Sequence, residues 1–189
     1  DEHHDMILAS IEAGARGVYV EKPFCRTPAE ADAILAAARR RNVKIAVAHR
    51  NRYHPALEKI KALLADNIIG RLIELRGRGK EDERGGSLDL WVLGSHILNL
   101  AHFFAGPATA CSATILQKGK PATPADKIDG AEGAGPLAGD EVHARFETES
   151  GLPIFFDSKI KQGTREAGFG LQLIGAEGVI DLRIDREPL

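Results

Sequence analysis

The fold is decided by residues 17–23, Gly-Val-Tyr-Val-Glu-Lys-Pro, and by the Thr-Pro-Ala-Glu of residues 27–30 that follows them. The first stretch is a short β-branched and aromatic run that ends in a polar turn. Because this run is apolar without alternation and lies between helical patterns, it predicts a strand of a parallel sheet buried on both faces. Ligands of open α/β sheets bind at the carboxyl ends of such strands, where Lys22 lies with Pro23 stiffening the backbone behind it.

The segments around this strand predict a strand–helix–strand unit. Residues 1–14 have the pattern of a helix with acidic residues at its start and a glycine at its end. Thr27 is expected to cap the next helix while Glu30 reaches back, and three arginines at 39–41 suit its carboxyl end. Residues 43–48 (VKIAVA) then predict a second buried strand. Two parallel strands joined by a helix form half of a doubly wound nucleotide-binding architecture.

From residue 49 onward the pattern changes from alternating helices and strands to a mainly β chain. The expected order is a basic turn at 49–54, a helix at 55–65, strands at 70–79 and 110–116, a charged loop at 80–86, a buried helix at 88–104, an irregular loop at 119–139, and strands at 141–148, 152–160, 169–174 and 179–184. The predicted fold class is therefore α/β followed by α+β, with a large, mainly antiparallel open sheet. We expect two domains, residues 1–49 and 50–189.

Composition narrows the class of protein. A hydrophobic content of 43% supports a packed core, and a net charge of −2 argues against nucleic acid or an anionic membrane as the main partner. Two cysteines, Cys25 and Cys111, are too few for a disulfide framework, and no spacing suggests a metal site. No apolar run reaches about 18 residues, and no signal peptide is recognisable. We therefore expect a cytoplasmic protein.

Residues 85–100 carry the polar groups that need an explanation. A glycine pair, Gly85-Gly86, allows close approach of the chain, and the helix after it carries His96 and Asn99 one turn apart. Unpaired polar groups on an apolar helix cost ~1–3 kcal/mol each, so a partner or ligand is expected there. His102 and His143 are interpreted as hydrogen-bonded core histidines. No Walker loop, GxSxG or HExxH motif occurs.

Glu21-Lys22-Pro23, the basic turn before Pro55, and Gly85-Gly86 leading to Gly94-Ser95-His96 together resemble the Gfo/Idh/MocA family of oxidoreductases. The turn at residues 175–178 also agrees. The resemblance implies a Rossmann domain followed by an α/β domain whose open sheet mediates oligomers and bounds the substrate site. It implies NAD- or NADP-dependent hydride transfer to or from a sugar, polyol or related hydroxyl carbon, in a homo-oligomer (dimer or tetramer).

The resemblance also implies roles for single residues. Lys22 would lie beside the nicotinamide and the reacting oxygen, and His96 would exchange the hydroxyl proton, so these two are the expected catalytic residues. The expected cofactor contacts are Glu21, Lys22, Pro23 and Arg52, and the expected substrate contacts are Lys22, Tyr53, Trp91, His96 and Asn99.

The sequence departs from the family pattern in two ways. Val92 stands where an acidic residue is common, and Asp89 would point roughly 60° away from it around an α-helix. The glycine-rich GxGxxG turn that binds pyrophosphate is absent from the 189 residues. We therefore expect a fragment that lacks the N-terminal part of the Rossmann domain and is inactive alone. The alternative is a non-catalytic carbohydrate-binding or oligomerisation module derived from the family.

Overall fold

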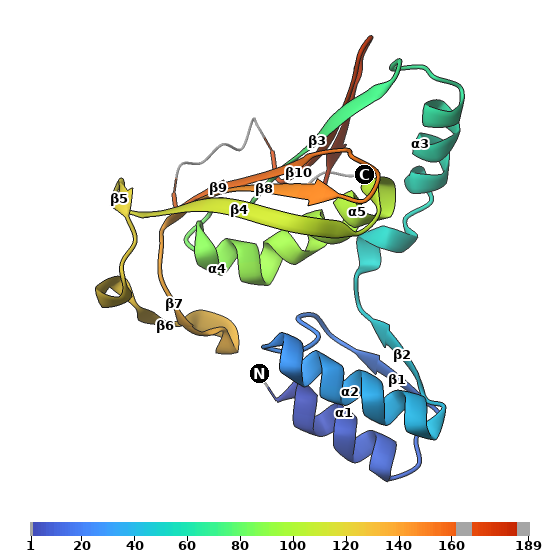
Figure 1. Cartoon of the computed structure of the whole chain (residues 1–189), viewed down its shortest axis with the longest axis vertical. Helices are drawn as coiled ribbons and strands as arrows, with labels where there is room; N and C mark the ends of the chain where they lie inside the picture. Colours follow the sequence, from blue (N-terminus) through green and yellow to red (C-terminus); the bar gives the residue numbers. More distant parts are fainter. Residues whose placement is uncertain (1, 162–167, 185–189) are drawn as a thin grey trace.

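The computed structural model describes residues 2–161 and 168–184, which pack around two hydrophobic clusters. The smaller cluster draws its buried residues from positions 7–43 and the larger one from positions 57–182. Figure 1 shows the corresponding parts of the chain one below the other, connected by the segment that follows β2. No helix of the described residues is both long and apolar enough to cross a membrane.

The smaller part is the expected helix–strand–helix–strand unit. Its elements are α1 (His3–Glu12), β1 (Gly17–Val20), α2 (Pro28–Arg41) and β2 (Lys44–Val47). The two strands pair in parallel, with Gly17 opposite Lys44. The Thr27 hydroxyl accepts the Glu30 amide at 3.2 Å, as predicted, while the Glu30 carboxylate accepts the amide of Arg26 rather than that of the cap itself. Both contacts fix the start of α2.

The prediction that these strands are buried on both faces is wrong for the described residues. Burial alternates along β1 and β2, and the Tyr19 side chain is 73% exposed. Val18 and Val20 join the small core with residues of α1 and α2, whereas Tyr19 and Ala46 point to the other, uncovered face. An apolar run without alternation indicates that a strand can be buried on both faces of its sheet. Whether both faces are in fact covered depends on which elements pack against them.

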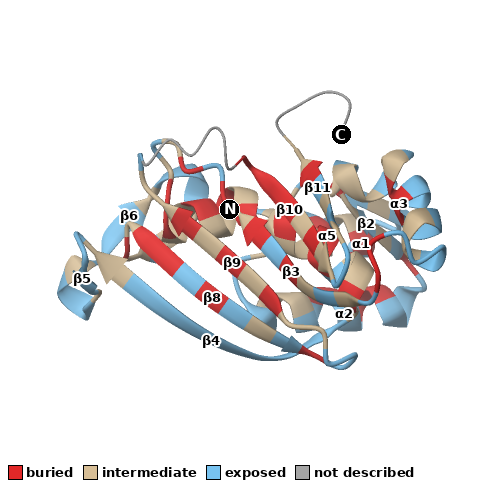
Figure 2. Cartoon of the chain, turned by 90° about the horizontal axis from the view of Figure 1, so that it is seen from above, coloured by how far each residue is buried: buried red, intermediate tan, exposed pale blue. Residues whose placement is uncertain are grey.

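The larger part is built on a seven-stranded sheet with the strand order β11-β10-β3-β9-β8-β4-β5. Its strands are β3 (Leu72–Arg78), β4 (Ala108–Gln117), β5 (Lys120–Pro121), β8 (Glu141–Thr148), β9 (Ile154–Lys159), β10 (Gly170–Gly175) and β11 (Val179–Arg183). Among the strand pairs of the described residues in this sheet, only β3–β9 is parallel. Figure 2 shows one face of the sheet open, with the helices on the other side. The predicted mainly antiparallel open sheet is confirmed.

One long helical segment covers the inner face of the sheet. It consists of α4 (Ser87–Asp89), a π-helical turn η2 (Leu90–Gly94) and α5 (Ser95–Ala105). The sequence predicts a buried helix here, but the π turn is not predicted. Gly94 lies so close to the sheet that a Cβ atom would come within 2.9 Å of the Phe156 ring. The helix is therefore held against β9 at the turn itself.

The remaining connections are η1 (Arg50–Tyr53) and α3 (Ala56–Ala65), which lead from β2 to the large sheet. The segment 119–139, expected to be irregular, contains β5, η3 (Pro124–Asp126), β6 (Ile128–Gly130), η4 (Ala131–Gly133) and β7 (Gly135–Leu137). β6 and β7 pair as a small antiparallel hairpin below β4 (Figure 1). These elements have only two or three residues each, so no periodic pattern is visible in the sequence.

A buried polar cluster fastens the charged loop 80–86 to the sheet. Asp89 is fully buried, and its carboxylate accepts the Ser158 hydroxyl at 2.6 Å and the Glu81 amide at 3.0 Å. A Cβ atom on Gly85 would overlap the backbone of Ile160, and one on Gly86 would overlap that of Asp140. The close approach expected of the glycine pair is confirmed, and it positions the start of the helix that carries His96.

Candidate active site

Lys22 connects the two parts of the molecule. β1 ends at Val20, and the Lys22 ammonium, two residues later, donates a hydrogen bond of 2.8 Å to the carbonyl oxygen of Val92. Val92 lies inside the π turn, where backbone carbonyls are displaced from regular α-helical pairing. The position that lacks the expected carboxylate therefore still receives the lysine, through its backbone oxygen.

His96 lies next to the same group. The pKa of His96 is lowered to about 4, first by burial and then by the charges of Lys22, His49 and Arg50 in that order, while Glu21 opposes the shift. The imidazole is therefore neutral around pH 7 and its unprotonated nitrogen is available as a proton acceptor. Lys22 and His96, which come from different parts of the sequence, act on one another electrostatically.

His49 is a member of this site that the sequence reasoning missed. Its ring meets that of His96 edge to face, with 5.8 Å between the ring centroids. Burial, followed by the charges of Lys22 and Arg52, lowers the pKa of His49 as well. A usable signal was present in the sequence. His49 follows β2, which is parallel to β1, and the carboxyl ends of neighbouring parallel strands share one edge of the sheet.

Buried polar atoms without a hydrogen-bond partner gather in this region of the described chain. They are His49 Nδ1, Trp91 Nε1, His96 Nδ1 and Asn99 Oδ1. Buried side-chain nitrogen and oxygen atoms are usually paired, and leaving one unpaired costs ~1–3 kcal/mol. Such a concentration is typical of a site that is completed by a bound molecule or by ordered water. Among the described residues, no three His, Cys, Asp or Glu side chains are grouped as metal ligands would be.

The other predicted site residues differ in how they contact the region around Lys22 and His96. The Glu21 carboxylate accepts the amide of Lys22 at 3.1 Å, and the Pro23 carbonyl accepts a hydrogen bond from His3. Arg52 lies 5.1 Å above the Phe103 ring, on α5. Tyr53 is 75% exposed. The structure thus brings Glu21, Lys22 and His96 to the junction of the two parts. Trp91 lines the adjoining cavity with Pro23, Asn99 lies one turn beyond His96 on α5, and Tyr53 faces mostly solvent.

A cavity of about 640 Å³ opens beside these residues. It lies between the loop after β1, the helix segment η2–α5, the inner face of β4 and β8, and the β6–β7 hairpin. Its lining residues are Pro23, Phe24, Arg26, His49, Ser87, Leu90, Trp91, Ser95, Leu98, Cys111, Ala113, Ile115, Ala134, Pro136, Leu137, Val142, Ala144 and Phe146. The cavity reaches the candidate centre through His49, whose ring contacts His96.

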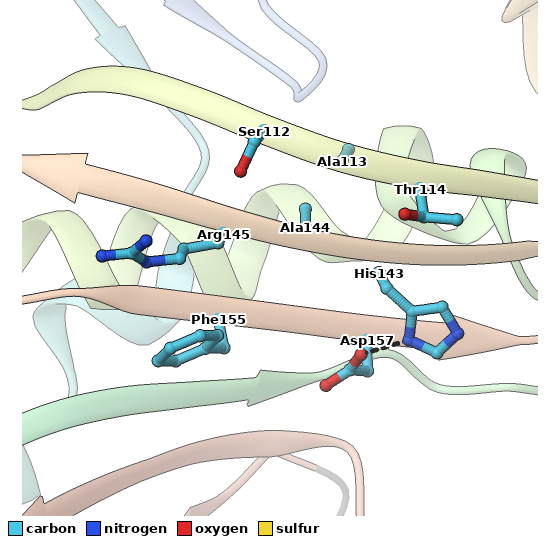
Figure 3. Close-up of a pocket in the computed structure, with 8 residues that line it drawn as sticks. All are labelled: Ser112, Ala113, Thr114, His143, Ala144, Arg145, Phe155 and Asp157. Atoms are coloured by element: carbon cyan, nitrogen blue, oxygen red, sulfur yellow. Dashed lines mark hydrogen bonds and ion pairs between the residues drawn. The ribbon is translucent and has the colours of Figure 1, made fainter.

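A second depression, of about 280 Å³, lies on the open face of the sheet (Figure 3). One of its lining residues is His143, which bonds Asp157 at 2.5 Å and Glu141 at 2.8 Å through its two ring nitrogens. Because both nitrogens are engaged by carboxylates, neither is open to a substrate proton. The interpretation of His143 and His102 as core histidines is wrong: both lie on exposed surface positions.

The parallel β1–α2–β2 unit, the open mixed sheet and a lysine–histidine pair at their junction define an α/β protein of the class that binds ligands at the carboxyl ends of its parallel strands. Residues 1–49 match the oxidoreductase family described as having an NAD-binding Rossmann fold, Gfo/Idh/MocA. This match, together with the similarity of the whole chain to oxidoreductases, confirms the resemblance to the Gfo/Idh/MocA oxidoreductases that was inferred from the motifs.

Individual comparisons agree with this family. Over 97% of its length the chain is 27% identical to levoglucosan dehydrogenase of Pseudarthrobacter phenanthrenivorans, covering 53% of that protein. An NAD-binding oxidoreductase from Klebsiella pneumoniae is similar over 98% of the chain and 52% of its own, with 25% identity and a TM-score of 0.73. An inositol dehydrogenase homologue from Azotobacter vinelandii, complexed with NADH and myo-inositol, gives a TM-score of 0.68 at 18% identity, over all of this chain and 55% of the other. The chain spans about half the length of these proteins.

Proposed function

We propose that the protein carrying this chain is an NAD- or NADP-dependent oxidoreductase that transfers a hydride between the nicotinamide and a hydroxyl or carbonyl carbon of a sugar, polyol or related compound. The observation that carries the proposal is the meeting of Lys22 and His96 at one junction, next to the ends of two parallel strands. The dehydrogenase names of the relatives support it, and the bound NADH and myo-inositol of the Azotobacter vinelandii protein support its cofactor and substrate class.

In this proposal His96 accepts or donates the hydroxyl proton, and Lys22 stabilises the charge on the reacting oxygen. During oxidation the C–H bond of the alcohol breaks with its electron pair, the O–H proton goes to neutral His96, and a C=O bond forms. The ammonium of Lys22 stabilises the negative charge that develops on the oxygen. Because the pKa of His96 is lowered to about 4, His96 is free to accept a proton at neutral pH but holds it weakly, so it passes the proton on.

The residues present fit the nicotinamide end of a dinucleotide site. The buried Nδ1 atoms of His49 and His96, whose rings are in contact after β2, have no hydrogen-bond partner in the described chain, so a polar group of the cofactor or substrate could satisfy them. When bound, NAD or NADP supplies the hydride acceptor or donor. Glu21, Lys22, Pro23 and Arg52 would hold it from the turns after the two strands. Asn99 and Trp91 would contact the substrate, with Tyr53 at the solvent-exposed edge.

The test is hydride transfer by the full-length protein that contains these residues. Sugars and polyols would be offered with NAD⁺ or with NADP⁺, and the appearance of reduced nicotinamide would be followed by its absorbance. Turnover with at least one polyol supports the proposal. Binding of sugars without any turnover would instead support a non-catalytic carbohydrate-binding module, an alternative that none of the named relatives favours.

Three further properties belong to the same proposal. We infer a division into domains at residues 1–49 and 50–189, because the two hydrophobic clusters fall on either side of this boundary. A homo-oligomer that pairs through the open sheet face is supported by the absence of any described element over that face. A cytoplasmic location is supported by a composition with two cysteines, both free.

A further inference from the structure

The cavity of about 640 Å³ has the size of a small-molecule site, but most of its wall is apolar. The sheet contributes three cross-strand pairs whose side chains point into it. These pairs are Ile115 with Val142, Ala113 with Ala144, and Cys111 with Phe146. Adjacent residues in β4 and β8, such as Thr114 and His143, point to the opposite, polar face. This wall is therefore an apolar surface of two paired strands.

The opposite walls have the same character. Leu90, Trp91 and Leu98 line the cavity from the helix, and Pro136 and Leu137 line it from the β6–β7 hairpin. The hairpin is held near the helix because the Ser87 hydroxyl donates a 2.6 Å hydrogen bond to Ala138. Arg26 is the one lining residue with a formal charge at neutral pH. A free sugar has hydroxyl groups on every side, and these walls would leave most of them without hydrogen-bond partners.

The cavity and the candidate centre are continuous. His49 lines the cavity, and its ring contacts that of His96. Ser95, next to His96 in the sequence, also lines it. A molecule whose hydroxyl carbon lies near Lys22 and His96 could therefore extend an attached group past His49 and into the apolar space.

We propose that the substrate of this protein is amphiphilic: a hydroxyl-bearing ring or chain at Lys22 and His96 is joined to an apolar group that occupies the cavity under β4 and β8. For the reacting end of the substrate the inference rests on the proposed function. For the apolar end of the substrate it rests on the cavity. It specifies the substrate class more narrowly than a sugar or polyol. Alkyl or aryl glycosides and ring-bearing diols belong to this class.

The 189 residues contain one tryptophan, Trp91, and it lines the cavity. In the full-length protein, the part of the emission that is lost in Trp91→Phe therefore reports occupancy of the cavity. The matched probes are hexyl β-glucoside and methyl β-glucoside, which share a sugar and differ only in the alkyl tail. We expect hexyl glucoside to bind at least tenfold more tightly and to change Trp91 emission, because each buried methylene favours binding.

A matched pair of variants locates the binding. Side chains alternate along β4, so Ala113→Phe puts a ring on the face of Cys111 and Ile115, which line the cavity, whereas Thr114→Phe puts the same ring on the opposite face. Ala113→Phe should abolish the preference for the hexyl tail, and Thr114→Phe should retain it. Leu137→Asn, on the hairpin, gives a second test without added volume and should reduce the preference, should Ala113→Phe fail to fold as judged by circular dichroism.

The outcomes separate this inference from the proposed function. Equal affinity for the two glucosides, or a preference unaffected by both Ala113→Phe and Leu137→Asn, would overturn the inference. Turnover of small polyols by the full-length protein would then still support hydride transfer. A hexyl preference that depends on Ala113, together with no hydride transfer to or from any alcohol, would overturn the proposed function and leave an apolar binding site.

Discussion

At the scale of single residues, the unusual feature is a lysine whose described hydrogen-bond acceptor is a backbone carbonyl. The Lys22 ammonium donates to Val92 at 2.8 Å, and a carbonyl carries no formal charge. The positive charge of Lys22 is therefore only partly offset within the site, and it contributes to the low pKa of His96. A site of this kind favours ligands that develop negative charge, as an alcohol oxygen does when it gives up its proton.

Replacement of Lys22 by methionine tests that role. In the full-length protein, Lys22→Met should lower kcat about a hundred- to a thousandfold, because one charge-stabilising donor is lost in the transition state. The control is Lys44→Met, since Lys44 is exposed at the opposite end of β2 from His49. Steady-state kinetics with both variants decide the question, and unchanged turnover in Lys22→Met removes the lysine from the mechanism.

The low pKa of His96 predicts a displaced pH profile. Its pKa is about 4 in the folded protein, against an ordinary value of 6.5, so the imidazole loses its proton at a lower pH than a free histidine. For alcohol oxidation, kcat/KM should therefore rise with pH through an apparent pKa near 4 and be level by about pH 6. His96→Ala should be slow and lack this limb. If His96→Ala shows the same rise of kcat/KM with pH as the wild type, the group that titrates is not His96.

At the scale of elements, the π turn decides what the helix presents on each side. In unbroken α-helix, residues seven apart lie within roughly 20° of one another, so Asp89 and His96 would share a face. In the structure Asp89 bonds Ser158 on β9, whereas His96 meets His49 on the other side of the helix. The π turn thus separates a buried carboxylate from the imidazole whose pKa it would otherwise raise.

The buried Asp89 should be important for stability. Asp89→Ala would leave the Glu81 amide and the Ser158 hydroxyl without the acceptor that they share, and unfolding should become easier by about 2–4 kcal/mol. Urea unfolding followed by circular dichroism measures the change. Asp66→Ala, at an exposed position at the end of α3, is the control and should change stability by less than about 0.5 kcal/mol. Equal effects of the two variants would contradict the assignment.

Local sequence chemistry predicts most of these elements and not their arrangement. Thr27 and the arginines at 39–41 mark both ends of α2, and alternation marks β8 and β9 correctly. The π turn has no local signal, because it follows from the fit of Gly94 against Phe156 on a distant strand. The hairpin of β6 and β7 is likewise too short for any period to be visible.

At the scale of the whole molecule, the central place of β3 depends on contacts far apart in sequence. β3 lies between β9 and β10, parallel to the one and antiparallel to the other. Short turns determine which neighbouring strands pair as hairpins. The position of β3 between β9 and β10 depends instead on how the inner face of the sheet packs on α5. For the candidate site, the resemblance predicted Lys22 and His96, while the apolar cavity depends on residues of six separate segments and could not be predicted from the sequence.

The open face of the sheet predicts a pH dependence of stability. Asp157 and, next, Glu141 raise the pKa of His143 above its ordinary value, so the folded protein holds that proton more tightly than the unfolded chain. The resulting stabilisation is complete below about pH 6 and is lost as the pH rises through the folded pKa. The melting temperature should therefore fall between about pH 6 and pH 9.

The His143→Gln variant provides the comparison. Its melting temperature should show less of this decline, since glutamine does not titrate. His102→Gln, at an exposed position on α5, should keep the wild-type decline. If His143→Gln and wild type decline in parallel, another group is responsible for the pH dependence. The same outer face carries the proposed contact between subunits, so light scattering of both variants shows whether they keep the same molar mass.

The π turn has one more consequence, which concerns length. A π turn arises when an α-helical turn accommodates one additional residue, so the two helical halves beside it keep the orientation that a shorter helix would give them. Buried helices ordinarily do not tolerate insertions or deletions, because each one rotates all later side chains by about 100°. Between residues 90 and 94 a one-residue deletion would leave Asp89 directed to β9 and His96 directed to the junction. Related chains could therefore differ in length at this point while keeping the same side chains in the same places.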